Sequence, residues 1–202
     1  NMVSLIAPEN VDAPSMFKWN NGFSWAYSGN VADSMKQRVK AAGGKIDGDL
    51  RFSIQWNEDG KDDCDLDAHC KEVATNTEIY YGSYRGRKGI SPCGGNLDVD
   101  IIHPGKDIAV ENIVYADKTK MKPGQYAFFV HQFGGSAKSG FRAEIEFGGN
   151  VYSYDYSNRM RTGEYVQVAI VSVDKDRNLS ITHLLKESAS GREVWGLKTN
   201  QF

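Results

Sequence analysis

The sequence predicts a mainly β fold, an antiparallel β-sandwich of about eight or nine strands with a short N-terminal helix. From residue 50 onward, short segments alternate apolar and polar residues with a period of two. Turn-forming segments such as "NEDGKDD", "KMKPG" and "FGGSAKSG" separate them at close intervals. Because no repeat or proline-rich linker divides this region, we expect one β-sandwich domain at residues 46–185.

Residues 1–45 are expected to form an N-terminal extension that contains the helix. Val31, Met35 and Val39 recur every four residues, which places them on one helix face. Asn30 can cap the start and the glycines after residue 42 can end the helix, so we expect it at about 31–42. Residues 186–202 are expected to be a C-terminal tail, and their pattern lacks a clear stop, which indicates that the protein continues beyond them.

The first expected strand is "LRFSIQW" at 50–56, in which Leu50, Phe52 and Ile54 alternate with polar residues as in a half-buried strand. Gly149 and Asn150 predict a hairpin between the expected strands "FRAEIEF" and "VYSYDY". The other expected strands are 64–70, 78–83, 96–102, 124–133, 141–147, 151–156, 165–173 and 179–185.

Composition and charge give no support to several classes of function. The 202 residues are 40% hydrophobic and 25% charged with a net charge of -2, so there is no broad basic field and nucleic acid is not expected as a partner. The apolar runs are far shorter than the roughly 20 residues of a membrane span. The three cysteines are odd in number, and Cys64 and Cys70 would lie about 20 Å apart on a strand, so a reducing compartment such as the cytoplasm is favoured.

The most informative motif is "DDCDLDAHC" at 62–70. Alternation places its cysteines toward the core and the set Asp63, Asp65, Asp67 and His69 on the opposite face. A second acidic ladder in "NLDVDII" adds Asp98 and Asp100. If the two strands lie side by side, up to five carboxylates gather on one surface, and such oxygen-rich clusters suit Ca²⁺.

Other interpretations of the ladder stay open. Asp65 or Asp67 can accept backbone N–H groups or pair with Arg51 or Arg142, or the carboxylates can simply be solvated. A zinc site built from the cysteines and His69 is less favoured, since the spacing matches no known zinc motif and a strand turns His69 away from the cysteines.

The sequence favours a non-enzymatic protein. It contains no G-x-S-x-G elbow, P-loop or G-x-G-x-x-G motif after a strand. Tyrosines instead indicate a possible binding surface that could receive a carbohydrate or a protein partner. The alternative is that these tyrosines belong to the core, because tyrosine is common in sheets. The candidate ligand-binding residues are Tyr152, Tyr154, Tyr156, Tyr84 and Arg85.

Five motifs occur in an order that resembles the YfaP-like family of uncharacterised bacterial proteins: "DLDAH", "EIYYGS", "SPCGGNLDVDI", "VENIVY" and "PGQYAFFVHQF". The resemblance covers residues 50–173 and implies a β-sandwich, frequently one module of a larger protein, with no established catalytic activity. It singles out Asp65, Asp67, His69, Asp98 and Asp100. Ala68 and Cys70 depart from the family pattern, and the segments that flank the β region more weakly resemble proteins of prophages or mobile elements.

The sequence as a whole therefore predicts a non-catalytic binding or scaffolding module of a larger bacterial or phage-related protein. Its expected partners are other domains of the same chain or a separate protein. The alternative is a module that depends on a divalent cation, with Ca²⁺ as the possible cofactor, or that binds carbohydrate through the acidic ladders and tyrosines.

Overall fold

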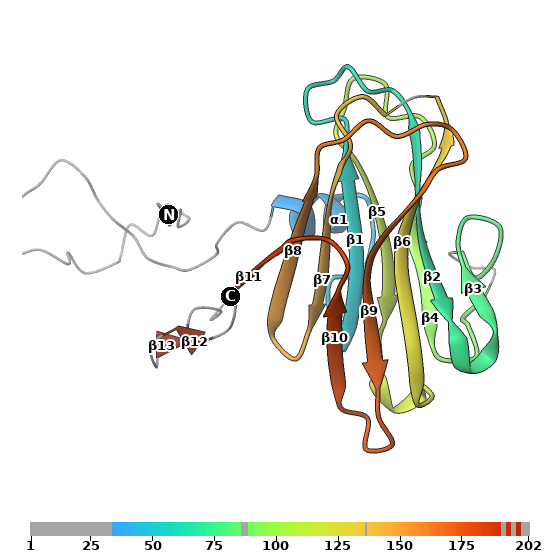
Figure 1. Ribbon diagram of the computed structural model, residues 1–202, viewed down its shortest axis with the longest axis vertical. Helices are drawn as coiled ribbons and strands as arrows, with labels where there is room; N and C mark the ends of the chain where they lie inside the picture. Colours follow the sequence, from blue (N-terminus) through green and yellow to red (C-terminus); the bar gives the residue numbers. More distant parts are fainter. Residues whose placement is uncertain (1–33, 86–88, 136, 191–192, 195–196, 199–202) are drawn as a thin grey trace, which may run out of the picture.

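The computed structural model describes residues 34–85, 89–135, 137–190, 193–194 and 197–198, and it confirms the predicted antiparallel β-sandwich. Sheet A has the strand order β11-β8-β7-β1-β5-β4, and sheet B the order β10-β9-β6-β2-β3. The two sheets stack face to face, and the helix α1 lies on the outer side of sheet A (Figure 1). Among the described residues, no helix has the length and apolar content needed to cross a bilayer.

The strands of sheet A come from both halves of the chain. They are β1 (Leu50–Trp56), β4 (Gly95–Val99), β5 (Ala109–Tyr115), β7 (Phe141–Phe147), β8 (Asn150–Tyr156) and β11 (Glu187–Ser190). The predicted hairpin is present between β7 and β8, where Gly148 and Gly149 form the turn with positive φ at both positions. Strand β11 pairs with β8 and thus extends sheet A past the expected domain boundary at residue 185.

Sheet B carries the "DLDAH" motif near one edge. Its strands are β2 (Asp65–Glu72), β3 (Thr77–Ile79), β6 (Gly124–Gly134), β9 (Tyr165–Val173) and β10 (Leu179–His183). The short pair β12 (Glu193–Val194) and β13 (Leu197–Lys198) forms a separate ladder, and 3-10 turns lie at Val73–Thr75 and Lys118–Lys120.

The core lies between the sheets and consists of the inward residues of both. Trp56, Tyr115, Tyr126 and Phe128 are among its largest fully buried side chains. All three cysteines are buried free thiols, which confirms that Cys64 and Cys70 do not bridge. Burial of this apolar surface is the main force that holds the sheets together.

Helix α1 (Ser34–Ala41) covers the part of the outer face of sheet A that β1 and β5 form. Met35 and Val39 pack on Val99 and Val110 in a second small apolar cluster. Strand β1 is therefore buried along its whole length, and the expectation of a half-buried strand is wrong because the helix covers its polar face. The helix lies within the predicted range, and residues 31–33 fall outside the described part.

The buried guanidinium of Arg51 finds hydrogen-bond and ion-pair partners on this covered face. It is 1% exposed, and it donates hydrogen bonds to Ser53 Oγ at 2.6 Å and to Glu146 Oε2 at 2.9 Å. Lys36 of α1 contacts the same glutamate at 2.9 Å, which ties the helix to β7. The predicted alternative in which Arg51 or Arg142 pairs with the acidic motif is wrong, since Arg142 pairs with Asp155 instead.

Candidate metal centre

The candidate site lies where β2 of sheet B passes the ends of β4 and β5 of sheet A. Strand β3 pairs only with residues Cys70–Glu72 of β2, so no strand of the described chain covers the edge of β2 between Asp65 and His69. Glu111 fills this position from β5, and its Oε2 accepts a hydrogen bond from the Ala68 backbone N–H at 2.6 Å. A carboxylate thus takes the place of the missing neighbour strand.

Glu111 points into the sandwich from the inner face of sheet A. It pairs with Ile54 across the β1·β5 ladder, and Ile54 is an inward core residue. Glu111 is 0% exposed. Neither Glu111 as a ligand nor β5 as a strand was predicted from the sequence.

Asp100 reaches the same place through a β-bulge in β4. Leu97 pairs with Ile113 and Val99 pairs with Asn112, so Asp98 is an extra residue in β4. The bulge turns Val99 outward to the helix cluster, and the next residue, Asp100, faces the edge of β2. The two acidic strands belong to different sheets and are not paired with each other, although Asp67 and Asp100 still come together.

Three carboxylates meet at this junction. One oxygen each of Asp67, Asp100 and Glu111 lies within 4.8 Å of the others. Asp67 is 2% exposed, and its Oδ2 has no hydrogen-bond partner; Glu111 Oε1 also has none. Asp65, 8% exposed, adds a further unpartnered oxygen, its Oδ1, next to the group. Buried carboxylate oxygens without a donor are costly, and a cation is the usual means of satisfying them.

Burial and mutual repulsion make these groups weak acids. Burial, followed by the charges of Asp65 and Asp100, raises the pKa of Asp67 to about 7. Burial and the charge of Asp100 raise the pKa of Asp65 to about 6. Burial and the contact with Asp100 raise the pKa of Glu111 well above its usual range. Asp65, Asp67 and Glu111 therefore give up their protons less readily than ordinary carboxyl groups when no cation is bound.

Asp100 has a cationic partner at the rim of the cluster. Arg85 Nε lies 2.6 Å from Asp100 Oδ2, and the Arg85 side chain is 38% exposed. The guanidinium partly offsets the negative charge from the solvent side. Arg85, expected to bind an external ligand, is thus engaged with the acidic cluster itself.

We predict that the acidic cluster makes the ion-free protein less stable as pH rises. Asp65 and Asp67 have folded-state pKa values of about 6 and about 7, above the value of about 3.9 in an unfolded chain. Between these values the folded state binds more protons than the unfolded state, so the free energy of unfolding falls as pH rises from about 4 to 7. Asp67→Asn removes one of these titrating groups, so its free energy of unfolding should fall less over this pH range.

The test compares melting temperatures of EDTA-treated wild type and Asp67→Asn between pH 5 and pH 8. As pH rises, the melting temperature of Asp67→Asn should increase relative to that of the wild type. Other titrating groups affect both proteins alike, so a difference that stays constant over this range would contradict the prediction.

Two of the predicted metal-binding aspartates hold backbone segments instead. Asp63 Oδ1 accepts from the Gly105 N–H at 3.0 Å. Asp98 lies on the outer face of sheet A, where it accepts from the Lys45 N–H and from Asn112 Nδ2, each at 2.7 Å. Neither belongs to the acidic cluster of the described residues.

The expected surface of tyrosines is not an open platform. Tyr154 is 1% exposed and its hydroxyl contacts His183 Nδ1 at 2.9 Å. Tyr152 and Tyr156 are partly buried and pack on the core through Phe147 and Phe141, at ring separations of 5.4 Å and 5.2 Å. Tyr84 is also partly buried against the core. The prediction of an exposed tyrosine face was wrong because β8 turns these rings inward.

His69 lies on the outer face of β2, and it is 3% exposed because aromatic rings cover it. It stacks on Phe129 at 4.9 Å and on Tyr80 at 5.3 Å. The cysteine-based zinc site is not formed. Cys70 Sγ lies 3.2 Å from the Tyr115 hydroxyl in the core, and no candidate metal group among the described residues includes a cysteine.

Comparisons with known proteins add little to this geometry. No protein-family model and no curated protein matches the chain. Among solved structures, the chain is similar to a homologue of the telluride resistance protein TerD from Streptomyces coelicolor A3(2). The match has 13% identity and a TM-score of 0.45, and it covers 70% of this chain and 90% of that chain. A match at this level carries no argument about function, and the resemblance to the YfaP-like family stays a prediction.

Proposed function

We propose that this protein is a calcium-binding β-sandwich module, in which Asp65, Asp67, Asp100 and Glu111 hold the ion. The observation that carries the proposal is the set of buried carboxylate oxygens that lack hydrogen-bond donors, Oδ1 of Asp65, Oδ2 of Asp67 and Oε1 of Glu111. A divalent cation would satisfy these oxygens and offset the burial and the mutual repulsion that together raise the pKa values of Asp65 and Asp67.

The donor set favours Ca²⁺ over other common cations. The four residues offer only carboxylate oxygens, the ligands of hard cations. Ca²⁺ accepts six to eight oxygens in a flexible geometry, whereas Mg²⁺ needs strict octahedral coordination and retains several waters. Carboxylates that come from two different sheets and from a bulge are more easily arranged around the larger and less demanding ion.

Calcium binding would serve the binding or scaffolding role predicted from the sequence. The ligands come from β2 of sheet B and from β5 and the end of β4 in sheet A. An ion held by both sheets would stabilise the junction between them, and any partner surface near Arg85 would then depend on calcium.

We predict that calcium raises the melting temperature of the EDTA-treated protein. An ion at about 100 times its Kd stabilises the folded state by about 2.7 kcal/mol. For a domain of this size that corresponds to a rise of about 5–10 °C. Isothermal titration calorimetry with CaCl₂ and MgCl₂ measures affinity and selectivity, and we expect one strong calcium site per chain.

Two isosteric variants separate the cluster from general charge effects. Asp100→Asn should lose most of the calcium response. Asp155→Asn is the matched control, because it makes the same chemical change at an exposed residue of β8 that pairs with Arg142 at 2.9 Å, outside the acidic cluster. If millimolar Ca²⁺ produces no shift in the wild type, or if both variants respond equally, the proposed site does not exist.

A further inference from the structure

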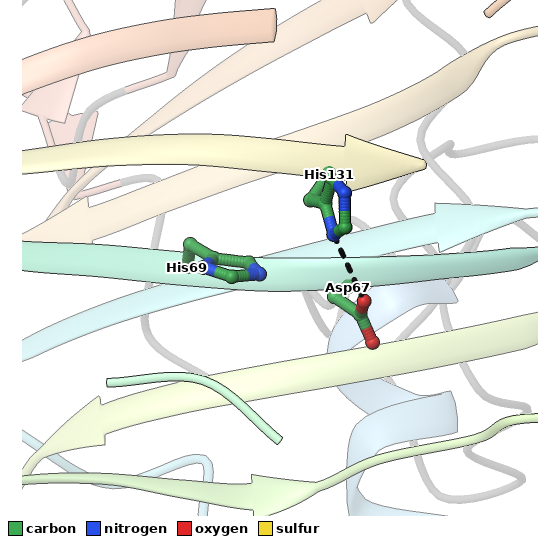
Figure 2. Close-up of side chains that lie close together, drawn as sticks. All are labelled: Asp67, His69 and His131. Atoms are coloured by element: carbon green, nitrogen blue, oxygen red, sulfur yellow. Dashed lines mark ion pairs between the residues drawn. The ribbon is translucent and has the colours of Figure 1, made fainter. Parts of the chain in front are cut away.

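A second group of metal-ligand side chains lies on the outer face of sheet B. Asp67 and His131 are directly opposite each other in the β2·β6 ladder, and His69 follows Asp67 by two residues on the same face of β2. One ligand atom of each residue lies within 4.8 Å of the others. Figure 2 shows the carboxylate of Asp67 directed toward His131, with His69 beside them on the same strand as Asp67.

Three potential ligand atoms of this group have no hydrogen-bond partner. They are His69 Nε2, His131 Nδ1 and Asp67 Oδ2. The His69 and Asp67 side chains are at least nine-tenths buried, and the side chain of His131 is 12% exposed. Buried polar atoms are normally paired. Three buried atoms of metal-ligand type that lack a hydrogen bond therefore meet at one point, which calls for a ligand.

Neighbouring residues hold both imidazoles in a suitable orientation. Glu78 Oε1 of β3 lies 2.8 Å from His69 Nδ1, so that nitrogen carries the proton and the lone pair of Nε2 is left for a metal. His131 stacks on Tyr165 with ring centroids 4.2 Å apart and an interplanar angle of 15°. A carboxylate behind a ligating histidine is the common arrangement around protein-bound zinc.

The separation of Asp67 and His131 also fits a metal. Oδ2 and Nδ1 are 3.4 Å apart and form no hydrogen bond. Two ligands at about 2.05 Å from a tetrahedral zinc ion are about 3.3 Å apart. We propose that Asp67, His69 and His131 bind a transition-metal ion of the zinc class, with a fourth coordination position left to water or to a ligand.

This site is distinct from the proposed calcium site in its chemistry. Two nitrogen donors and one carboxylate suit Zn²⁺ and related ions, whereas the acidic cluster offers only oxygen. Asp67 belongs to both groups. The histidines belong only to the zinc site, while Asp100 and Glu111 belong only to the calcium site, so variants can test each site separately.

The experiment measures binding of Zn²⁺ to the EDTA-treated full chain by calorimetry, and of Co²⁺ by its visible absorption. We expect one ion per chain and the strong absorption bands of tetrahedral Co²⁺. His131→Phe keeps a ring to stack on Tyr165 and should weaken Zn²⁺ binding at least about 100-fold. Glu78→Gln, which removes the charge behind His69, should weaken it about 10-fold to 100-fold.

Two controls keep the outcomes distinct. His103→Phe removes an exposed imidazole outside the group and should leave Zn²⁺ binding unchanged. Asp100→Asn should lose the calcium response and retain the Co²⁺ bands. The calcium response and the Co²⁺ bands thus test the two sites separately, and the zinc proposal can fail while the calcium proposal holds. Melting curves establish that each variant is folded. Equal Zn²⁺ affinity in folded wild type and His131→Phe, or the absence of Co²⁺ bands in the wild type, would overturn the inference.

Discussion

Replacing Glu111 with glutamine is expected to abolish the calcium-induced rise in melting temperature while the ion-free protein keeps the stability of the wild type. Burial and the contact with Asp100 raise the pKa of Glu111 well above its usual range, so the neutral form of this carboxyl is favoured in the ion-free protein. A glutamine has the same shape and the same neutral charge. Its side-chain oxygen can still accept the hydrogen bond from the Ala68 N–H.

The calcium response should nevertheless disappear, because the amide cannot supply a negative charge to the ion. We expect the rise of about 5–10 °C for the wild type to fall to about 1 °C or less. Glu144→Gln is the matched control, since it makes the same chemical change on the outer face of sheet A, where Glu144 contacts Arg51 at 3.3 Å. A Glu111→Gln variant that responds to calcium like the wild type would exclude Glu111 from the site.

Asn112→Ala is expected to lower the free energy of unfolding by about 3 kcal/mol, because the three hydrogen bonds of this buried side chain are lost at about 1 kcal/mol each. Asn112 is 0% exposed. Its Nδ2 donates to Asp98 Oδ1 at 2.7 Å and to the Lys45 carbonyl at 3.1 Å, and its Oδ1 accepts from Ser53 Oγ at 2.6 Å. The melting temperature should fall by about 6–12 °C.

The same variant should weaken calcium binding, although Asn112 is not a ligand. Asn112 anchors the bulged residue Asp98, and the bulge directs Asp100 to the acidic cluster. Asn178→Ala is the control, because Asn178 is exposed and bonds only to Asp174 of its own turn. If calcium raises the melting temperature of both alanine variants by the same amount, Asn112 does not hold the bulge in place.

Much of the fold was predictable because one face of most strands is apolar. The expected ranges of β1, β7 and β9 agree with the structure residue for residue. Strand β5 could not be recognised in the same way. It is buried on both faces, so "AVENIVY" lacks the alternation of a half-buried strand, and its glutamate and asparagine are uncommon in strands.

The candidate site was only partly predictable. Alternation correctly separated Asp67 and His69 from the nearby cysteines, but it could not show that their face is buried. The covering rings come from β6, from β9 and from Tyr80, just after β3. Glu111 was missed together with its strand. Asp100 was assigned to the same face as Asp98, because a bulge changes the alternation without a clear sign in the sequence.

The central position of β1 in sheet A has a consequence for the order of folding. Leu50 at the start of β1 pairs with Tyr115 on one side and with Phe147 on the other. During synthesis, β1 therefore leaves the ribosome long before either neighbour exists, and both of its edges remain open. Such non-local pairing makes folding slow and exposes nascent chains to association. The buried arginine, serine and glutamine of β1 oppose this association, because their side chains favour water until α1 and the neighbouring strands are in place.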